Sequence, residues 1–332
     1  MSNSKNIQKI TYNNRSYIWD GNKDDFSTFR IENEQPINVP THVTKYFRIS
    51  KYSVDALLNN YIYAAHPKEL NDPFDCYSKL IDTSEVSNKD VDFVEKKLRI
   101  KINREFILNK KNKNNFIEIL YELIFGSCGI ISVTDAKNQN PSLWANYTNN
   151  HQGFSVTYKK EAFRDIAIGP FKVDYVDNLE RLKYKSESFN SLVLWLTLIK
   201  SKYWRNEEEW RFIGRGMDTM YIPNKHFNKE KELTKNNRKL YLLKESVLEV
   251  RLGFYFFSYD NIITNNLNES VVNLNNEKDK ELKIKLLRYI KSNEIPLSYM
   301  HLDENEFKFR SVKLNYDFIE ETYTIKWKLP TI

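Results

Sequence analysis

Hydrophobic residues recur along the chain with two different spacings, which divide it into helical and extended segments. Spacings of three and four residues indicate helices, whereas short apolar or alternating runs indicate strands. Helices and strands follow one another without regular βαβ units, so we expect an α+β fold with a mixed or antiparallel central sheet and flanking helices. We predict helices at 54–58, 88–108, 116–124, 141–147, 179–200 and 278–292, and strands at 45–49, 61–65, 128–133, 153–158, 210–213, 247–252 and within 306–327.

The pattern also predicts how the chain is organised. Residues 1–40 are polar and rich in asparagine, and Pro36 and Pro40 close this segment. We expect an N-terminal extension outside the core, followed by a single main domain over residues 44–330. Residues 258–330 should supply the closing helix and strands of that domain. A chain of 332 residues can bury this core without disulfides or a structural metal.

The glycine content excludes two large classes of nucleotide-binding protein. The chain has only 8 glycines, and the one close pair, Gly214 and Gly216, is followed neither by a third glycine nor by Lys-Ser/Thr. Rossmann and P-loop sites need clustered glycines because the backbone must approach a phosphate. A dinucleotide could therefore bind here only through another kind of site.

Cysteine use and hydropathy indicate the compartment. Cys76 and Cys128 form neither a disulfide framework nor a CxxC pair. The N-terminus has no apolar signal segment, and the longest apolar run, 192–199, is shorter than the roughly 20 residues that span a bilayer. We expect a reduced, cytoplasmic protein without a membrane partner.

Positive charge is unevenly distributed. The net charge is +7, and residues 95–115 carry eight basic against two acidic side chains. A second basic stretch covers residues 225–245. Such patches favour polyanions through counterion release, although each stretch alone is more typical of a solvated helix face or loop. The candidate nucleic-acid contacts are Lys96, Lys97, Lys101 and Arg104.

The segment 200–213 is the most informative for chemistry. It places Glu207, Glu208 and Glu209 directly before a strand of large apolar residues. A carboxylate held where a strand enters the core can hydrogen-bond a sugar hydroxyl or stabilise an oxocarbenium-like transition state. The competing interpretation, favoured by the local sequence alone, is that Glu209 forms an ion pair with Arg211. Metal chemistry is a further alternative: a Mg²⁺-dependent nuclease or other phosphodiesterase would use Asp72, Asp75, Glu207 and Glu209.

Two further blocks contain residues suited to ligand binding. Arg48 lies in a short apolar strand beside Tyr46, where an inward-pointing guanidinium needs a carboxylate or an anionic ligand. Trp144 and Tyr147 lie three residues apart on one helix and share a face, so they could form a stacking wall or pack in the core. His66 and the turn that begins at Asn71 follow the second strand.

Taken in order, these blocks resemble a bacterial family. The Tyr-x-Arg strand, the Asn-Asp-Pro-Phe-Asp turn, the Asn-Pro-x-x-Trp-x-x-Tyr helix before His-x-Gly, and the motif Trp-x-x-Glu-x-Glu-Trp-Arg are similar to those of the bacterial domain of unknown function 2971. The resemblance covers residues 46–253. It supports the boundary of the core but supplies no activity.

The layout is also similar to that of toxin-type ADP-ribosyltransferases, in which a strand bearing Arg or His precedes a helix and a second strand, and a Glu opens a later strand. These enzymes bind NAD without a Rossmann motif. The resemblance implies that Glu209 acts at the nicotinamide ribose, that Arg48 holds the diphosphate or ribose, and that Trp144 or Tyr147 stacks on nicotinamide. The full hypothesis assigns catalysis to Glu209, Arg48 and Glu207, and NAD contacts to Tyr46, Arg48, His66, Asn71, Trp144, Tyr147 and Arg211.

Three functions therefore remain open from the sequence. The first is an ADP-ribosyltransferase-like enzyme acting on NAD, as a bacterial toxin or phage-defence effector with a nucleic-acid or protein target. The second is the metal-dependent nuclease or phosphodiesterase. The third is a non-catalytic defence protein that binds nucleic acid, in which the blocks are core packing. The first requires Arg48, Trp144 and Glu209 to converge in space.

Overall fold

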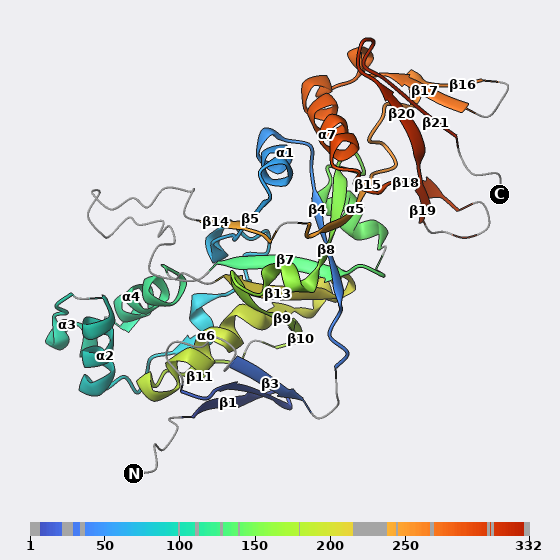
Figure 1. The fold of residues 1–332 in the computed structure, drawn as a ribbon. Coiled ribbons are helices and arrows are strands. Elements are labelled where there is room, and N and C mark those ends of the chain that lie inside the picture. The colour runs from blue at the N-terminus through green and yellow to red at the C-terminus, as the bar shows by residue number, and fades with distance from the viewer. Residues whose placement is uncertain are drawn as a thin grey trace.

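An eight-stranded sheet forms the centre of the molecule (Figure 1). Strands β15 and β18 pair in parallel, and the other neighbours pair antiparallel. The α+β fold with a mixed central sheet and flanking helices is thus confirmed. In spatial order the strands are β19 (Phe309–Lys313), β18 (Leu297–Leu302), β15 (Val247–Leu252), β8 (Phe154–Lys159), β4 (His42–Phe47), β7 (Ile130–Asp135), β13 (Glu209–Gly214) and β9 (Ala167–Lys172).

This computed structural model describes most of the chain. The described residues are 7–21, 29–33, 37–98, 100–109, 113–126, 129–138, 140–178, 180–214, 238–243, 245–265, 269–303, 306 and 309–328. Cys128 and most of the second basic stretch lie outside them.

The N-terminal segment belongs to the core, contrary to the sequence prediction. Its strands β1 (Gln8–Tyr12), β2 (Arg15–Trp19) and β3 (Phe29–Asn33) form an antiparallel sheet that packs against helix α6 (Phe189–Leu198). Tyr17 is fully buried, and its hydroxyl donates a hydrogen bond to Asp174 at 3.1 Å. The ring of Tyr12 meets Trp195 edge-on at 5.4 Å. The polar composition of the segment concealed these few large buried side chains.

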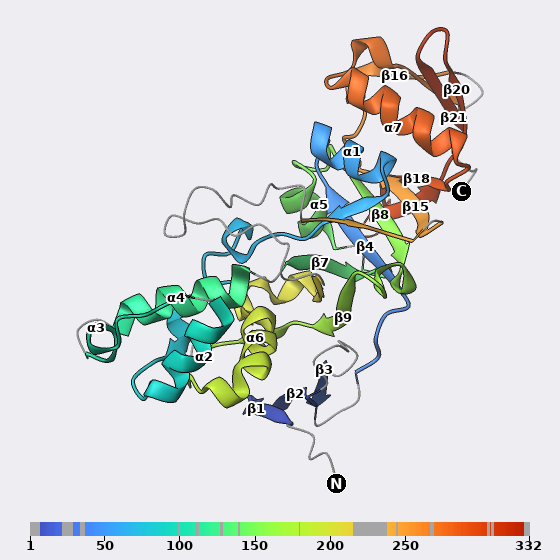
Figure 2. The same cartoon turned by 60° about the vertical axis from the view of Figure 1, so that its left-hand side comes forward.

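Three helices, α2 (Asn88–Leu98), α3 (Arg104–Leu108) and α4 (Lys113–Gly126), lie to one side of the central sheet (Figures 1 and 2). The predicted helix over 88–108 is divided into α2 and α3. The carboxylate of Glu95 accepts a hydrogen bond from the backbone N–H of Ile102 at 2.8 Å, and the side chain of Asn103 caps the new helix. These local bonds compete with a continuous helix.

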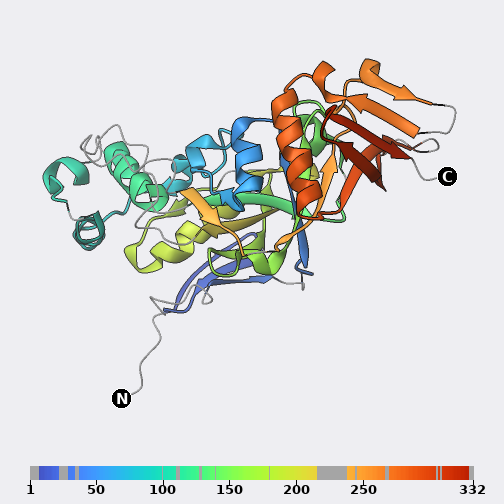
Figure 3. The same cartoon turned by 45° about the horizontal axis from the view of Figure 1, so that its top comes forward.

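The C-terminal region contributes helix α7 (Lys280–Ser292) and a four-stranded sheet beside it (Figure 3). Leu286, Leu287 and Ile290 on α7 are fully buried. They belong to the same hydrophobic cluster as Trp210 and Phe212 of the central sheet, so this region shares its core. The sheet contains β16 (Ile262–Thr264), β17 (Glu269–Asn273), β21 (Thr324–Lys328) and β20 (Asn315–Ile319).

The central sheet divides between β4 and β7, and this division positions the site. β4 pairs with β8 over six residues but with β7 at only two, Val43 and Thr44. Beyond Thr44 the two strands are no longer paired, and the other end of β7 forms a bridge from Ile130 to Ala65 instead. The remaining elements around this gap are α1 (Lys51–Leu58), β5 (Tyr61–Tyr63), α5 (Pro141–Tyr147), β10 (Asp174–Val176) and β12 (Ile199–Ser201).

Candidate functional site

A cavity of about 360 Å³ lies where the central sheet divides. Its size falls in the range of about 300–1,000 Å³ that is usual for small-molecule sites. Side chains from β4, β7, β13, α5 and the turn after β5 line it, so the blocks singled out in the sequence do converge. Of the predicted site residues, Arg48, Asn71, Tyr147 and Glu209 line this cavity.

One side of the cavity is built on an arginine that no solvent reaches. Arg211 donates from Nε to Glu209 at 2.7 Å and from Nη2 to both oxygens of Asp75, at 2.7 and 2.9 Å. Its Nη1 donates to the carbonyl oxygen of Thr197 at 2.8 Å. The interpretation that Glu209 pairs with Arg211 is therefore correct, and Arg211 itself lies behind the cavity wall rather than in it.

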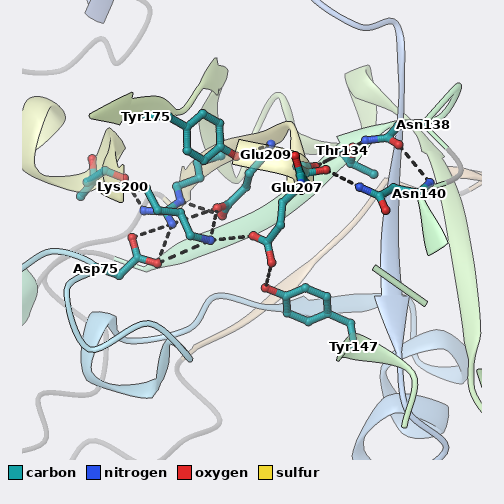
Figure 4. A network of polar contacts seen from close by, with 12 residues as sticks. Asp75, Thr134, Asn138, Asn140, Tyr147, Tyr175, Lys200, Glu207 and Glu209 are labelled. Carbon is teal, nitrogen blue, oxygen red and sulfur yellow. Dashed lines mark hydrogen bonds and ion pairs between the residues drawn. The ribbon is translucent and has the colours of Figure 1, made fainter. Parts of the chain in front are cut away.

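Lys200 extends this ion-pair network toward α5 (Figure 4). Its ammonium group lies 2.7 Å from a carboxylate oxygen of Glu207 and 2.8 Å from one of Glu209. The hydroxyl of Tyr147 donates to the other oxygen of Glu207 at 2.6 Å. Two buried cations thus hold three buried carboxylates, because Asp75 also lies 3.8 Å from Lys200.

The network fixes the charge of Glu209. Burial opposes ionisation, but Arg211 and Lys200 outweigh burial and hold the pKa of Glu209 at about 2. Burial lowers the pKa of Lys200, but the carboxylates of Glu209, Asp75 and Glu207 outweigh burial and raise it. Burial, followed by the charge of Glu207, raises the pKa of Tyr147. At neutral pH the carboxylate of Glu209 is therefore anionic, and the hydroxyl of Tyr147 keeps its proton and donates a hydrogen bond.

A left-handed residue brings the two acidic side chains together. The short helix Lys202–Glu207 ends at Glu208, whose φ of 46° turns the chain into β13. Glu208 is exposed, whereas Glu207 and Glu209 on either side of it are buried. Because strand residues alternate between faces, Arg211 then lies on the same face as Glu209. The motif Glu-x-Glu-x-Arg is therefore one structural unit.

Two cations at the cavity are not neutralised by acidic partners among the described residues. Lys45 lines the cavity and donates to the carbonyl oxygen of Ser132 at 3.1 Å. Arg48 lies just after β4 and is exposed, not inside the strand as predicted, and its guanidinium has no hydrogen-bond or ion-pair partner in the described part of the chain. The argument that burial forces Arg48 to pair is therefore wrong, yet its position at the rim suits an anionic ligand.

Three predicted ligand-binding residues have structural contacts instead. Trp144 is 1% exposed and meets the ring of Tyr46 edge-on at 5.1 Å, so stacking of a ligand on Trp144 is excluded. Tyr46 donates to the carbonyl oxygen of Asn138 and lines a smaller adjoining cavity of about 60 Å³ beside Glu207. His66 is 1% exposed, and its Nδ1 accepts from the backbone N–H of Lys68, which caps a short helix.

Sequence reasoning missed several side chains that line the cavity, among them Trp204, Lys45 and Ser132. Trp204 is half-buried, with the Lys200 ammonium 5.1 Å from its ring centroid, and it offers the aromatic wall that Trp144 cannot. It stands in the same motif as Glu207, so a signal was present. Lys45 and Ser132 carry no such signal, because their roles depend on where β4 and β7 separate.

The acidic residues do not form a metal site in the described structure. No group of three or more His, Cys, Asp or Glu side chains among the described residues is arranged to hold a metal ion. Lys200 and Arg211 occupy the oxygens of Asp75, Glu207 and Glu209 that a metal would need. Asp72 differs, since one of its buried oxygens has no hydrogen-bond partner.

The predicted nucleic-acid contacts lie on α2, in the link after it and at the start of α3, and none of them lines the cavity. Lys96, Lys97 and Lys101 are exposed. Arg104 is instead bonded to Asp92 at 2.5 Å and Glu95 at 2.7 Å, which reduces the basic character of this surface. The other basic residues of this stretch that would add to it, Arg99, Lys110 and Lys111, lie outside the described residues.

The fold and site define an α+β protein with a polar cavity at a division of its central sheet. No protein-family model, curated protein or solved structure matches the chain. The resemblance to the bacterial domain of unknown function 2971 therefore stays a prediction that rests on the four motifs. Within the described residues, no helix is long and apolar enough to cross a membrane.

Proposed function

We propose that the chain is an ADP-ribosyltransferase-like enzyme that binds NAD in the divided-sheet cavity and releases nicotinamide. The observation that carries this proposal is the convergence of Arg48, at the end of β4, with Glu209, at the start of β13, on one cavity. Between them in the chain come α1 and β5, which is the order of elements that the resemblance implies. The ADP-ribosyl group would pass to a nucleic-acid or protein acceptor.

The chemistry requires a negative charge beside a sugar carbon that becomes cationic. Glu209 supplies a carboxylate that is anionic at neutral pH and cannot be displaced easily, because Arg211 and Lys200 hold it. A preorganised charge stabilises developing charge without reorganisation during the reaction. Among the described residues, Oε1 of Glu209 accepts one hydrogen bond, from Arg211, which leaves a lone pair that could accept another from the ribose.

The rim supplies the complementary groups for the rest of NAD. Arg48 and Lys45 carry the positive charge that a diphosphate needs, and guanidinium groups bind phosphate oxygens in a bidentate manner. Trp204 and Tyr147 line the cavity with aromatic rings on which nicotinamide can stack. In this proposal Trp204 replaces Trp144 as the stacking residue, and Asn71 contributes an amide at the rim.

The biological setting is part of the same proposal. The exposed lysines of α2 favour a polyanionic acceptor, and the motifs favour a bacterial toxin or phage-defence effector in the cytoplasm. A protein partner of such a system remains an alternative acceptor.

Rim residues, rather than Glu209, give the sharpest test. Thermal unfolding is measured with and without millimolar NAD for the natural chain, for Arg48→Gln and for Trp204→Leu, and nicotinamide release is measured by chromatography. A ligand at about 100 times its Kd adds roughly 2.7 kcal/mol of stability. We expect a clear shift for the natural chain and a reduced shift for both variants. Lys101→Gln, an exposed change away from the cavity, is the matched control and should keep the full shift.

Two results would contradict the proposal. The first is an unchanged melting temperature at saturating millimolar NAD together with no nicotinamide release. The second is a shift of equal size in the natural chain and both rim variants, because NAD would then bind elsewhere. Arg48 is exposed and its guanidinium forms no hydrogen bond or ion pair with the described residues, so its substitution should leave the fold intact.

A further inference from the structure

Lys45 differs from Lys200, the other lysine that lines the cavity. Lys200 is bonded to two carboxylates, whereas no carboxylate of the described residues lies within 4 Å of the Lys45 ammonium group. The single hydrogen bond of its Nζ goes to the carbonyl oxygen of Ser132, a neutral acceptor. Lys45 lines both the main cavity and the smaller one beside it, so a ligand can reach it.

The surroundings increase the neutral fraction of this amine. Burial lowers the pKa of Lys45 to about 8, and the more distant charge of Glu209 opposes that decrease only in part. The charged groups that line the cavity with it are the acids Glu69, Asp72, Asp75 and Glu209, and the bases Arg48 and Lys200. Arg211 and Lys200 pair with Asp75 and Glu209, Glu207 of the smaller cavity pairs with Lys200, and neither Glu69 nor Asp72 forms an ion pair with the Lys45 ammonium group.

A neutral, accessible lysine amine is a nucleophile toward carbonyl groups. Arg48 follows three residues later and lines the same cavity with a guanidinium that has no ion-pair partner among the described residues. A molecule that carries both an aldehyde and a phosphate would meet an amine and an anion-binding group together. Trp204 adds an aromatic wall.

We propose that Lys45 is a covalent site for small anionic aldehydes, with which it forms an imine while Arg48 binds the anionic group. The amine nitrogen bonds to the carbonyl carbon, the carbonyl oxygen takes up a proton, and the resulting carbinolamine loses water to give the C=N bond. No electron transfer is involved, so no oxidant or reductant is needed. The site goes beyond the NAD proposal and does not depend on it.

The test uses pyridoxal 5′-phosphate as the probe and the full chain. After incubation at pH 8, borohydride reduces the imine to a stable secondary amine, and peptide mass spectrometry locates the label. About half of an amine with a pKa of about 8 is neutral at this pH, compared with well under 1% at the ordinary value of 10.5. We expect Lys45 to be labelled at least about tenfold faster than exposed Lys97. Equal or slower labelling of Lys45 would overturn the proposal.

Variants separate the amine from the anion-binding group. Lys45→Arg keeps a positive donor for Ser132 but should lose the fast label, whereas the control Lys97→Arg should retain it. Arg48→Gln should slow labelling by pyridoxal 5′-phosphate several-fold and leave labelling by pyridoxal, which lacks the phosphate, unchanged. An equal effect of Arg48→Gln on both reagents would refute the role of Arg48. The labelled positions in the natural chain decide whether Lys45 forms the imine, even if a variant does not fold. The assay contains no NAD, so its outcome does not depend on the NAD proposal.

Discussion

The substitution Glu209→Gln tests the buried ion-pair network directly. It preserves the shape of the side chain but removes the negative charge between Arg211 and Lys200, which now lie 2.7 and 2.8 Å from its two oxygens. A glutamine has one acceptor oxygen and a donor NH₂ group. Whichever way the amide is turned, its NH₂ group faces one of the two cations, donor against donor. We therefore expect the variant to be less stable.

The magnitude follows from two independent arguments. The pKa of Glu209 falls from the ordinary 4.5 to about 2 in the folded chain, and this difference corresponds to about 3 kcal/mol at neutral pH. Removing one partner of a buried ion pair costs roughly 3–5 kcal/mol in other proteins. Because the folded pKa is lowered, the stabilisation is complete above about pH 5 and decreases as the pH falls from the unfolded value toward 2.

Urea unfolding followed by tryptophan fluorescence measures this effect at pH 7 and pH 4. We expect a loss of about 3–5 kcal/mol at pH 7 and a loss smaller by about 1 kcal/mol at pH 4. Glu208→Gln, a change at the exposed neighbour, is the control and should cost less than about 0.5 kcal/mol. A loss below 1 kcal/mol at pH 7 for Glu209→Gln, or one that grows at pH 4, would refute the network. The stability of Glu209→Gln also determines what a loss of its NAD-cleaving activity means, since an inactive variant could simply be unfolded.

Other predictions concern packing and charge elsewhere. In Gly253→Ala the new Cβ would lie 2.2 Å from the carbonyl oxygen of His151. The free energy of unfolding, measured in urea, should therefore fall by about 1–3 kcal/mol. An unchanged midpoint would contradict this contact. Leu287→Ala should lower the free energy of unfolding by about 2–5 kcal/mol. Because α7 shares the central core, fluorescence and circular dichroism should still show a single unfolding transition. Two separate transitions would argue against a shared core. Replacing Lys96 and Lys97 together by Gln should reduce the salt slope of double-stranded DNA binding by about 2, and an unaltered slope would remove both from the interface.

Elements whose signals are local were predicted well from the sequence. The helix at 141–147 and the strand at 247–252 match α5 and β15 residue for residue. Spacing failed where side chains bond to the backbone and interrupt a periodic pattern, as between α2 and α3. It also failed at 179–200, where α6 begins only at Phe189 and residues 182–183 form a strand. Short strand pairs of this kind depend on a distant partner that no local window contains.

Composition misled at the N-terminus for a physical reason. In β1 and β2, Ile10, Tyr12 and Tyr17 pack in the hydrophobic cluster that includes α6, although polar residues lie beside them in the sequence. Tyr17, Ile18 and Trp19 are all buried, although the segment around them is polar. The fraction of polar residues therefore says little about whether a two-faced strand belongs to the core.

The candidate site was predicted in its parts but not in its arrangement. The sequence identified Glu209 and Arg48, and the cavity contains both. It did not identify Lys45 or Ser132, because their place in the cavity follows from β4 and β7 pairing at only two positions. Nor did it identify Lys200 as the partner of Glu207 and Glu209, since the choice among nearby cations depends on three-dimensional distances.

The arrangement of charge separates two tasks within one cavity. Asp75, Glu207 and Glu209 are neutralised in large part by Lys200 and Arg211, so the buried part is rigid and nearly balanced. Buried ion pairs recover the cost of desolvation only when further hydrogen bonds hold their geometry. Here Tyr147 donates such a bond to Glu207, and the carbonyl oxygen of Thr197 accepts one from Arg211. Among the described residues, neither the Lys45 ammonium group nor the Arg48 guanidinium forms an ion pair, and both line the cavity where a ligand enters. Both proposals use these two side chains: Arg48 would pair with an anionic group of the ligand, and Lys45 would either add positive charge beside it or, in its neutral form, react with an aldehyde.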